Sequence, residues 1–146
     1  MRFVFDIETD GLLPELTKIH CIELIHVESG TAYSFDPDRV QEGLNMLAKA
    51  TEIIGHNIIC FDIPAIQKLH PEWKPQGKVT DTLVLSQLLR GDVKNEDFDY
   101  DREYGHDLPK RLFGSHSLKA WGYRLKEHKE EIETDWKEWS PEMQKY

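Results

Sequence analysis

Residues 1–12 of the chain read MRFVFDIETDGL, and this stretch decides the fold. Its aromatic and β-branched residues are typical of a buried strand, and Asp10-Gly11 is a turn signal that ends the strand. Because side chains alternate along a strand, Asp6 and Glu8 should point to the same face. The stretch therefore predicts a strand that carries two acids into a functional site.

Two neighbouring carboxylates repel each other and lose hydration, a cost that protonation, a basic partner or a divalent cation can offset. Hard oxygen ligands on one face suit Mg²⁺ or Mn²⁺. Taken alone, the Asp6 and Glu8 pair also fits a strand end that bears two solvated acids. A second signature further along the chain is needed to decide between these interpretations.

The composition predicts one soluble globular domain. The chain has 146 residues, of which 39% are hydrophobic and 31% charged, enough for a substantial core. A net charge of −9 argues against a protein that binds nucleic acid by charge alone. It leaves open an enzyme whose bound metal ions carry the positive charge to the phosphate.

We expect a cytoplasmic protein with no membrane partner. The N-terminus enters a strand without the pattern of a signal peptide, and no apolar run approaches the length of a membrane span. Cys21 and Cys60 show neither metal-binding nor redox spacing, so we expect both thiols to stay reduced.

The order of elements predicts an α/β domain. Residues 17–27 and 31–35 are β-rich runs joined by a Gly-containing turn, so with the first strand they predict an antiparallel three-stranded meander. Alternating helices and short strands then predict a mixed central sheet flanked by helices. The expected helices begin at residues 36, 62, 82, 115 and 140, and the expected strands cover 53–55 and 78–80. Residues 91–113 are predicted to be irregular, residues 126–139 to be a solvated helix or extension, and residues 1–146 to form a single domain.

The second signature is residues 55–64, GHNIICFDIP, between a short strand and a helix. Asn57 falls in the loop and Asp62 at the helix entry, at a strand end where ligands of open α/β sheets bind. Alone, the pattern fits equally well a turn made by Asn57 and a helix N-cap made by Asp62.

The two signatures together resemble the DnaQ-like 3′–5′ exonucleases that have a DEDD metal site. Residues 81–86 (DTLVLS) and 114–125 (GSHSLKAWGYRL) resemble the proofreading domain of family A DNA polymerases, in the form found in short-tailed coliphages. The resemblance covers essentially the whole chain, with the motifs in family-like order and spacing. It implies an RNase H-like fold and the removal of nucleotides from single-stranded DNA 3′ ends, using two Mg²⁺ or Mn²⁺ ions.

The resemblance also assigns residues. It makes Asp6, Glu8 and Asp62 the metal-binding carboxylates. It makes Leu12 a wedge against the terminal bases. It also assigns a role in nucleotide binding to Thr9, Asn57 and Phe61. It further implies a polymerase domain or chain as partner, and the host cytoplasm as location if the protein is encoded by a phage.

The sequence departs from the family pattern at its end. In the tyrosine branch of the family a late helix carries Y-x-x-x-D, and residues 139–146 (WSPEMQKY) resemble the run-up to that motif. Tyr146 matches the tyrosine that orients the attacking water, a role that suits a phenol with an ordinary pKa near 10. The aspartate is absent, which indicates a fragment that ends inside the third exonuclease motif, a split subunit or a degenerate domain. We therefore expect weak metal binding and slow cleavage, partly rescued by Mn²⁺.

Several alternatives stay open at this point. His128 and Glu133 have the spacing of the histidine branch of the family, within a Lys/Glu-rich segment. The missing aspartate motivates a catalytically silent module that binds DNA or a partner protein, and a third hypothesis is a nuclease for RNA or branched DNA. Lys110 and Arg111 are candidates for phosphate contact, or a solvated basic turn.

Overall fold

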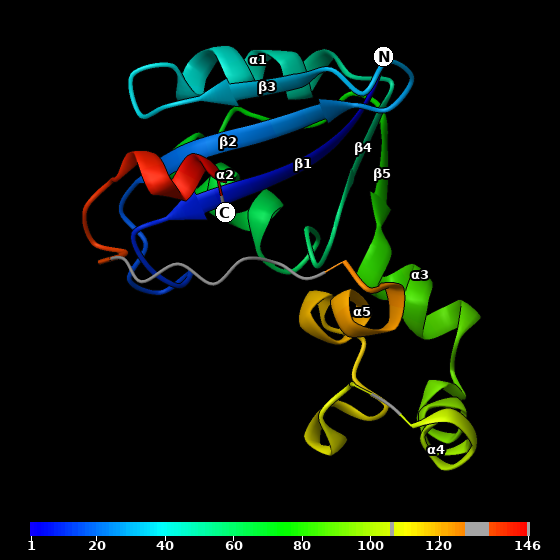
Figure 1. Cartoon of the computed structure of the whole chain (residues 1–146). Helices are drawn as coiled ribbons and strands as arrows, with labels where there is room; N and C mark the ends of the chain where they lie inside the picture. Colours follow the sequence, from blue (N-terminus) through cyan, green and yellow to red (C-terminus); the bar gives the residue numbers. More distant parts are fainter. Residues whose placement is uncertain (106, 128–134, 146) are drawn as a thin grey trace. The chain divides into compact units, whose positions relative to one another are not determined.

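The computed structural model describes residues 1–105, 107–127 and 135–145, the last of them without the side chain of Lys145. Five strands form one sheet in the order β3-β2-β1-β4-β5 (Figure 1). The strands are β1 (Arg2–Thr9), β2 (Ile19–His26), β3 (Ala32–Phe35), β4 (Glu52–Gly55) and β5 (Lys78–Asp81). Strands β1 to β3 pair antiparallel, whereas β4 pairs parallel to both β1 and β5. The predicted mixed sheet with an antiparallel meander is confirmed.

Strand β1 lies at the centre of the sheet because its sequence alternates strictly. Phe3, Phe5 and Ile7 are buried in the core, while Asp6 on the other face is exposed and Glu8 half-buried. The helices α1 (Val40–Lys49) and α2 (Asp62–Leu69) complete the core of this unit, with Leu44, Leu47, Ala65 and Ile66 fully buried. The core on one face leaves the acids of β1 on the other.

Helix α1 begins at Val40, so the prediction that it begins near Asp36 is wrong. The Asp36 carboxylate accepts a hydrogen bond from the backbone N–H of Asp38, at 3.2 Å. This local bond closes a turn around Pro37 that competes with helical geometry. The first helical turn therefore starts after the turn, with Arg39 at the cap position.

The chain divides into two compact units. The first contains residues 1–82 and the C-terminal residues from 132 onward, and the second contains residues 83–131. The single-domain assignment of residues 1–146 stays a prediction. Within the described residues, no helix combines the length and the apolar character that crossing a membrane requires.

The second unit is helical where the sequence predicted an irregular segment. It contains most of α3 (Thr82–Leu89), then α4 (Val93–Tyr104), the 3₁₀ helix η1 (Lys110–Leu112) and α5 (Leu118–Leu125). The prediction failed at α4 because VKNEDFDYDREY carries almost no apolar periodicity. Its buried residues are Val93 and Asp97, and Asp97 is paired with Arg124 of α5, a tertiary contact that no local pattern reveals.

Helix α5 is capped two residues later than predicted. The Ser117 hydroxyl accepts a hydrogen bond from the backbone N–H of Ala120 at 3.3 Å, so Ser117 and not Ser115 is the N-cap. The Ser115 hydroxyl instead donates to the Ser117 hydroxyl and accepts from its backbone N–H, at 3.0 and 3.2 Å.

The C-terminal segment packs on the sheet of the first unit. The 3₁₀ helix η2 (Pro141–Lys145) lies against β2, with Met143 fully buried (Figure 1). The buried His20 of β2 donates from Nε2 to the backbone carbonyl of Trp136, at 2.8 Å. His20 thus ties this segment to the sheet. The helix expected from Ser140 is this short 3₁₀ turn, and much of 126–139 lies outside the described residues.

Candidate active site

Three acids predicted from the sequence come together at the end of β1 and the start of α2. Asp62 is the first residue of α2 and only 3% exposed. Burial raises the pKa of its carboxyl to about 7, and the negative charges of Asp6 and then Glu8 add to this, against the opposing effect of the backbone N–H groups of Asp62 and Ile7. The three carboxylates are therefore close enough to act on one another electrostatically.

Asp62 is not simply a helix cap. The cap position of α2 is Phe61, and no side chain caps the helix there. One carboxylate oxygen of Asp62, Oδ1, is buried without a hydrogen-bond partner among the described residues. A buried acceptor left unpaired costs free energy, so its retention suggests a ligand rather than a structural role.

The face of the sheet that carries Asp6 and Glu8 is strongly negative. Strand register places Asp6 opposite Glu23 and Glu8 opposite Cys21. Burial, followed by the charges of Glu23, Glu8 and Asp6, raises the pKa of the Cys21 thiol to about 12. Burial also raises the pKa of Glu23, although the Ser34 hydroxyl donates to its carboxylate at 2.5 Å. This face favours a cation.

Glu23 is the acid that sequence analysis missed. It lies in the middle of IHCIELIH, where an acid on a half-exposed strand looks like ordinary surface. Its position opposite Asp6 depends on the register of β1 against β2, which one sequence does not define. The only usable signal was its placement on the same alternating face as Cys21.

A buried aspartate holds the loop between β4 and α2. Asp81, at the end of β5, accepts hydrogen bonds from the backbone N–H groups of Asn57 and Ile59, both at 3.0 Å. Asn57 has a left-handed backbone with φ of 66°, and its carbonyl accepts from the N–H groups of Cys60 and Phe61. Asn57 thus makes a turn, as one of the two interpretations of the motif allowed. The contacts of Asp81 with this loop were not predicted from the sequence.

Gly55 lets the same loop approach β1. A Cβ at this position would lie 2.4 Å from Cγ2 of Ile58 and 2.9 Å from the carbonyl oxygen of Phe5. The Thr82 hydroxyl donates to the Gly55 carbonyl at 3.2 Å and lies 3.0 Å from Nδ1 of His56. The loop that leads to Asp62 is thus fixed by β1 on one side and by the end of β5 on the other.

The family model of the RNase H superfamily matches residues 3–138, nearly the whole chain. The chain belongs to the RNase H superfamily. The RNase H-like fold expected from the motifs is thereby confirmed.

Relatives of this RNase H superfamily chain include two phage polymerases. The DNA-directed DNA polymerases of Enterobacteria phage T3 and Escherichia phage T7 are each 37% identical to it over 144 residues, which cover 92% of this chain and 20% of the polymerase. The chain thus spans about a fifth of the length of these relatives. A zinc-bound complex of E. coli Exonuclease I with single-stranded DNA shares the fold, with a TM-score of 0.54 and 16% identity over 81% of this chain and 33% of the other.

The donor set of this RNase H superfamily chain fits a hard divalent cation. Its carboxylates supply oxygen ligands, and the unpartnered Oδ1 of Asp62 is an acceptor in need of one. Over residues 1–105, 107–127 and 135–145, no three His, Cys, Asp or Glu side chains already form a group that could hold an ion.

The residues predicted to contact substrate lie around these acids. The Thr9 hydroxyl donates to the Gly11 carbonyl at 3.0 Å and shapes the turn after β1, and Leu12 in that turn is 71% exposed. Asn57 and Phe61 are half-buried in the loop before α2. Their substrate roles stay predictions. Tyr146, His128 and Glu133 lie outside the described residues, so their roles stay predictions as well.

The predicted basic pair belongs to the second unit. Lys110 and Arg111 are exposed in η1, and Lys110 lies 3.9 Å from the carboxylate of Asp101. An exposed pair at this distance contributes little to stability. Phosphate contact by these two residues stays a prediction.

Proposed function

We propose that the chain is a 3′–5′ exonuclease domain that removes nucleotides from DNA 3′ ends by metal-dependent phosphodiester hydrolysis. The observation that carries this proposal is Asp62. It is a buried carboxylate with an unpartnered oxygen, under the electrostatic influence of Asp6 and Glu8. Membership of the RNase H superfamily and the identity to phage DNA polymerases support it.

Asp6, Glu8 and Asp62 are proposed to hold two divalent cations, Mg²⁺ or Mn²⁺. Such ions make water a nucleophile near neutral pH and stabilise the charge on the leaving oxygen. Without a cation, the Asp62 carboxyl has a pKa of about 7 and stays protonated below that pH. Binding of a cation must therefore displace the proton. Metal affinity should therefore rise as the pH is raised through 7.

The remaining residues are proposed to hold the substrate. Asn57, in a loop anchored by Asp81, and Phe61, directly before Asp62, contact the terminal nucleotide. The exposed Leu12 wedges against the last bases. Tyr146 orients the attacking water. The partners are single-stranded DNA 3′ ends and a polymerase domain or chain, and the expected location is the cytoplasm of the host cell.

The test is digestion of a 5′-labelled single-stranded DNA with Mg²⁺ and with Mn²⁺. We expect a ladder of one-nucleotide steps, strongest with Mn²⁺. The Asp6→Asn variant should lose the ladder, and the Asp38→Asn variant, which changes an exposed aspartate in the turn before α1, should keep it.

Other outcomes identify the other functions. A labelled RNA of the same sequence, degraded faster than the DNA, would favour a ribonuclease. No ladder with either ion, from protein that is folded by circular dichroism, would reject the exonuclease and favour the silent binding module.

A further inference from the structure

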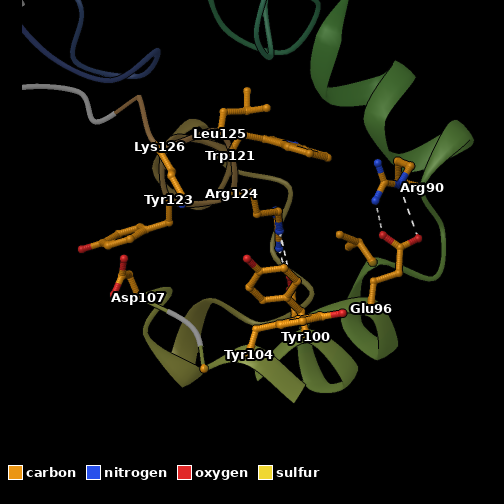
Figure 2. Close-up of a pocket in the computed structure, with 13 residues that line it drawn as sticks. Arg90, Glu96, Tyr100, Tyr104, Asp107, Trp121, Tyr123, Arg124, Leu125 and Lys126 are labelled. Carbon is orange, nitrogen blue, oxygen red and sulfur yellow. Dashed lines mark hydrogen bonds and ion pairs between the residues drawn. The ribbon is translucent and has the colours of Figure 1, made fainter. Parts of the chain in front are cut away.

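The second unit contains a pocket that the proposed active site does not use. Its volume is about 650 Å³, within the range of small-molecule sites. Figure 2 shows residues of α4 along one side and of α5 along the other. The side chains that matter for its chemistry are Tyr100 and Tyr104 from α4, and Trp121, Tyr123, Arg124 and Lys126 from α5 and its C-cap.

The arginines of the pocket are already neutralised. Arg124 donates from Nε and Nη2 to the two carboxylate oxygens of Asp97, at 2.9 and 2.7 Å, and these side chains are 9% and 3% exposed. Arg90 forms an ion pair with Glu96. A bidentate pair of this kind has little capacity left for a phosphate. Neither arginine is therefore available to bind an anion.

Aromatic side chains also line the pocket. The rings of Tyr100 and Tyr104 lie 5.2 Å apart, and Tyr104 is 68% exposed. Trp121 has the guanidinium of Arg124 over its ring at 4.9 Å, and its indole N–H is buried without a partner among the described residues. A planar aromatic ligand would stack on such exposed rings.

We propose that this pocket binds an unpaired nucleobase, stacked on one of the two tyrosine rings, Tyr100 or Tyr104, whose planes are tilted by 47°. The inference deepens the proposed function and rests on it, since the base belongs to the single-stranded substrate or to a mononucleotide released from it. A chain with a net charge of −9 gains little from phosphate attraction. Stacking of bases on aromatic rings contributes to single-strand binding and tolerates any base sequence.

The test is the affinity of a 5′-fluorescein single-stranded oligonucleotide, measured by anisotropy in EDTA to prevent cleavage. Replacing both tyrosines with alanine (Tyr100→Ala, Tyr104→Ala) should weaken binding about fivefold or more, the smallest loss expected for one stacked base. The Tyr100→Phe, Tyr104→Phe variant keeps both rings and should bind within about twofold of the unchanged protein. Phe98→Ala, on the same helix but outside the pocket, is the matched control.

Two further arms identify the ligand. An oligonucleotide of abasic residues should bind the unchanged protein and the double alanine variant equally, because only a base can lose stacking. Deoxyadenosine monophosphate is then added as a competitor of the labelled oligonucleotide. Competition with the unchanged protein but not with the double alanine variant would show that the pocket also accepts the free nucleotide. No competition would mean that the pocket accepts only bases in a strand.

The outcomes separate this inference from the proposed function. Equal affinity of the unchanged protein and the double alanine variant for the normal oligonucleotide, with the cleavage ladder intact, would overturn the pocket alone. A loss of affinity in the double alanine variant that is as large for the abasic strand would also overturn the pocket proposal. The loss would then not depend on a base. An unchanged protein that neither binds nor cleaves single-stranded DNA would overturn both.

Discussion

Replacing Asp62 with asparagine should remove a large part of the pH dependence of stability. The change keeps the shape of the side chain and removes the charge that burial disfavours. In the metal-free protein the carboxyl has a pKa of about 7, against an ordinary value of 3.8. Between pH 3.8 and about pH 7, the folded state therefore holds a proton that the unfolded state has lost.

The sign and size follow from proton linkage. Where the folded state binds more protons than the unfolded state, stability falls as the pH rises. Each pH unit between 3.8 and about 7 costs about 1.4 kcal/mol, for a ceiling of about 4 kcal/mol above pH 7. Between pH 5 and pH 8 this one group should lower the free energy of unfolding by up to about 3 kcal/mol.

The assay is urea unfolding in EDTA, followed by circular dichroism at pH 5, 6, 7 and 8. The difference between the Asp62→Asn variant and the unchanged protein isolates this group, because the other titrating residues are common to both. We expect the variant to gain relative stability as the pH rises, with the change complete near pH 8. The Asp38→Asn control should run parallel to the unchanged protein.

Parallel curves for the Asp62→Asn variant and the unchanged protein would refute the reasoning. They would mean that Asp62 is as well solvated in the folded chain as in the unfolded one. Mn²⁺ at pH 8 gives a second check, because a ligand that binds only the folded state stabilises it. It should raise the midpoint of the unchanged protein and not that of the variant.

Three further predictions concern the supports of the fold. Asp81→Asn loses one of two acceptors for partly buried loop amides and should cost about 1–3 kcal/mol in urea unfolding. A change below about 0.5 kcal/mol would contradict the anchoring role. Arg124→Met removes the guanidinium that neutralises the buried Asp97 carboxylate and should cost about 3–5 kcal/mol. Adding Asp97→Leu should recover part of the loss, and no recovery would show that the charge is not the cause. Under native conditions at pH 8, a thiol reagent should modify the exposed Cys60 quickly and spare Cys21, which is buried and has a pKa of about 12. Rapid modification of both thiols would show that the face of the sheet around Cys21 is open to solvent.

The sheet could be predicted from the sequence because its strands carry strong local signals. Alternation in residues 2–9 and the Gly-containing turn before residue 31 define the meander, and the start of α2 at Asp62 matches the prediction. Helix α4 could not be predicted, because its buried contacts are one valine and one aspartate paired with a residue 27 positions away. Local pattern gives no information on such a pair.

The site shows the same division. Asp6 and Glu8 share a face because the strand period is two, and Asp62 follows from a motif at the end of a strand. Glu23 and the loop contacts of Asp81 depend on which strands are neighbours and in what register. Those facts belong to the folded chain, so the sequence predicted the acids and not their surroundings.

The most direct test of the metal site is Mn²⁺ binding, followed by electron paramagnetic resonance of the free ion at pH 8. The unchanged protein should bind Mn²⁺, and Asp6→Asn and Asp62→Asn should each weaken binding about tenfold or more, as expected for the loss of a charged ligand. The Asp38→Asn variant should bind as the unchanged protein does. Equal Mn²⁺ affinity in all four proteins would contradict the claim that Asp6 and Asp62 hold the cation.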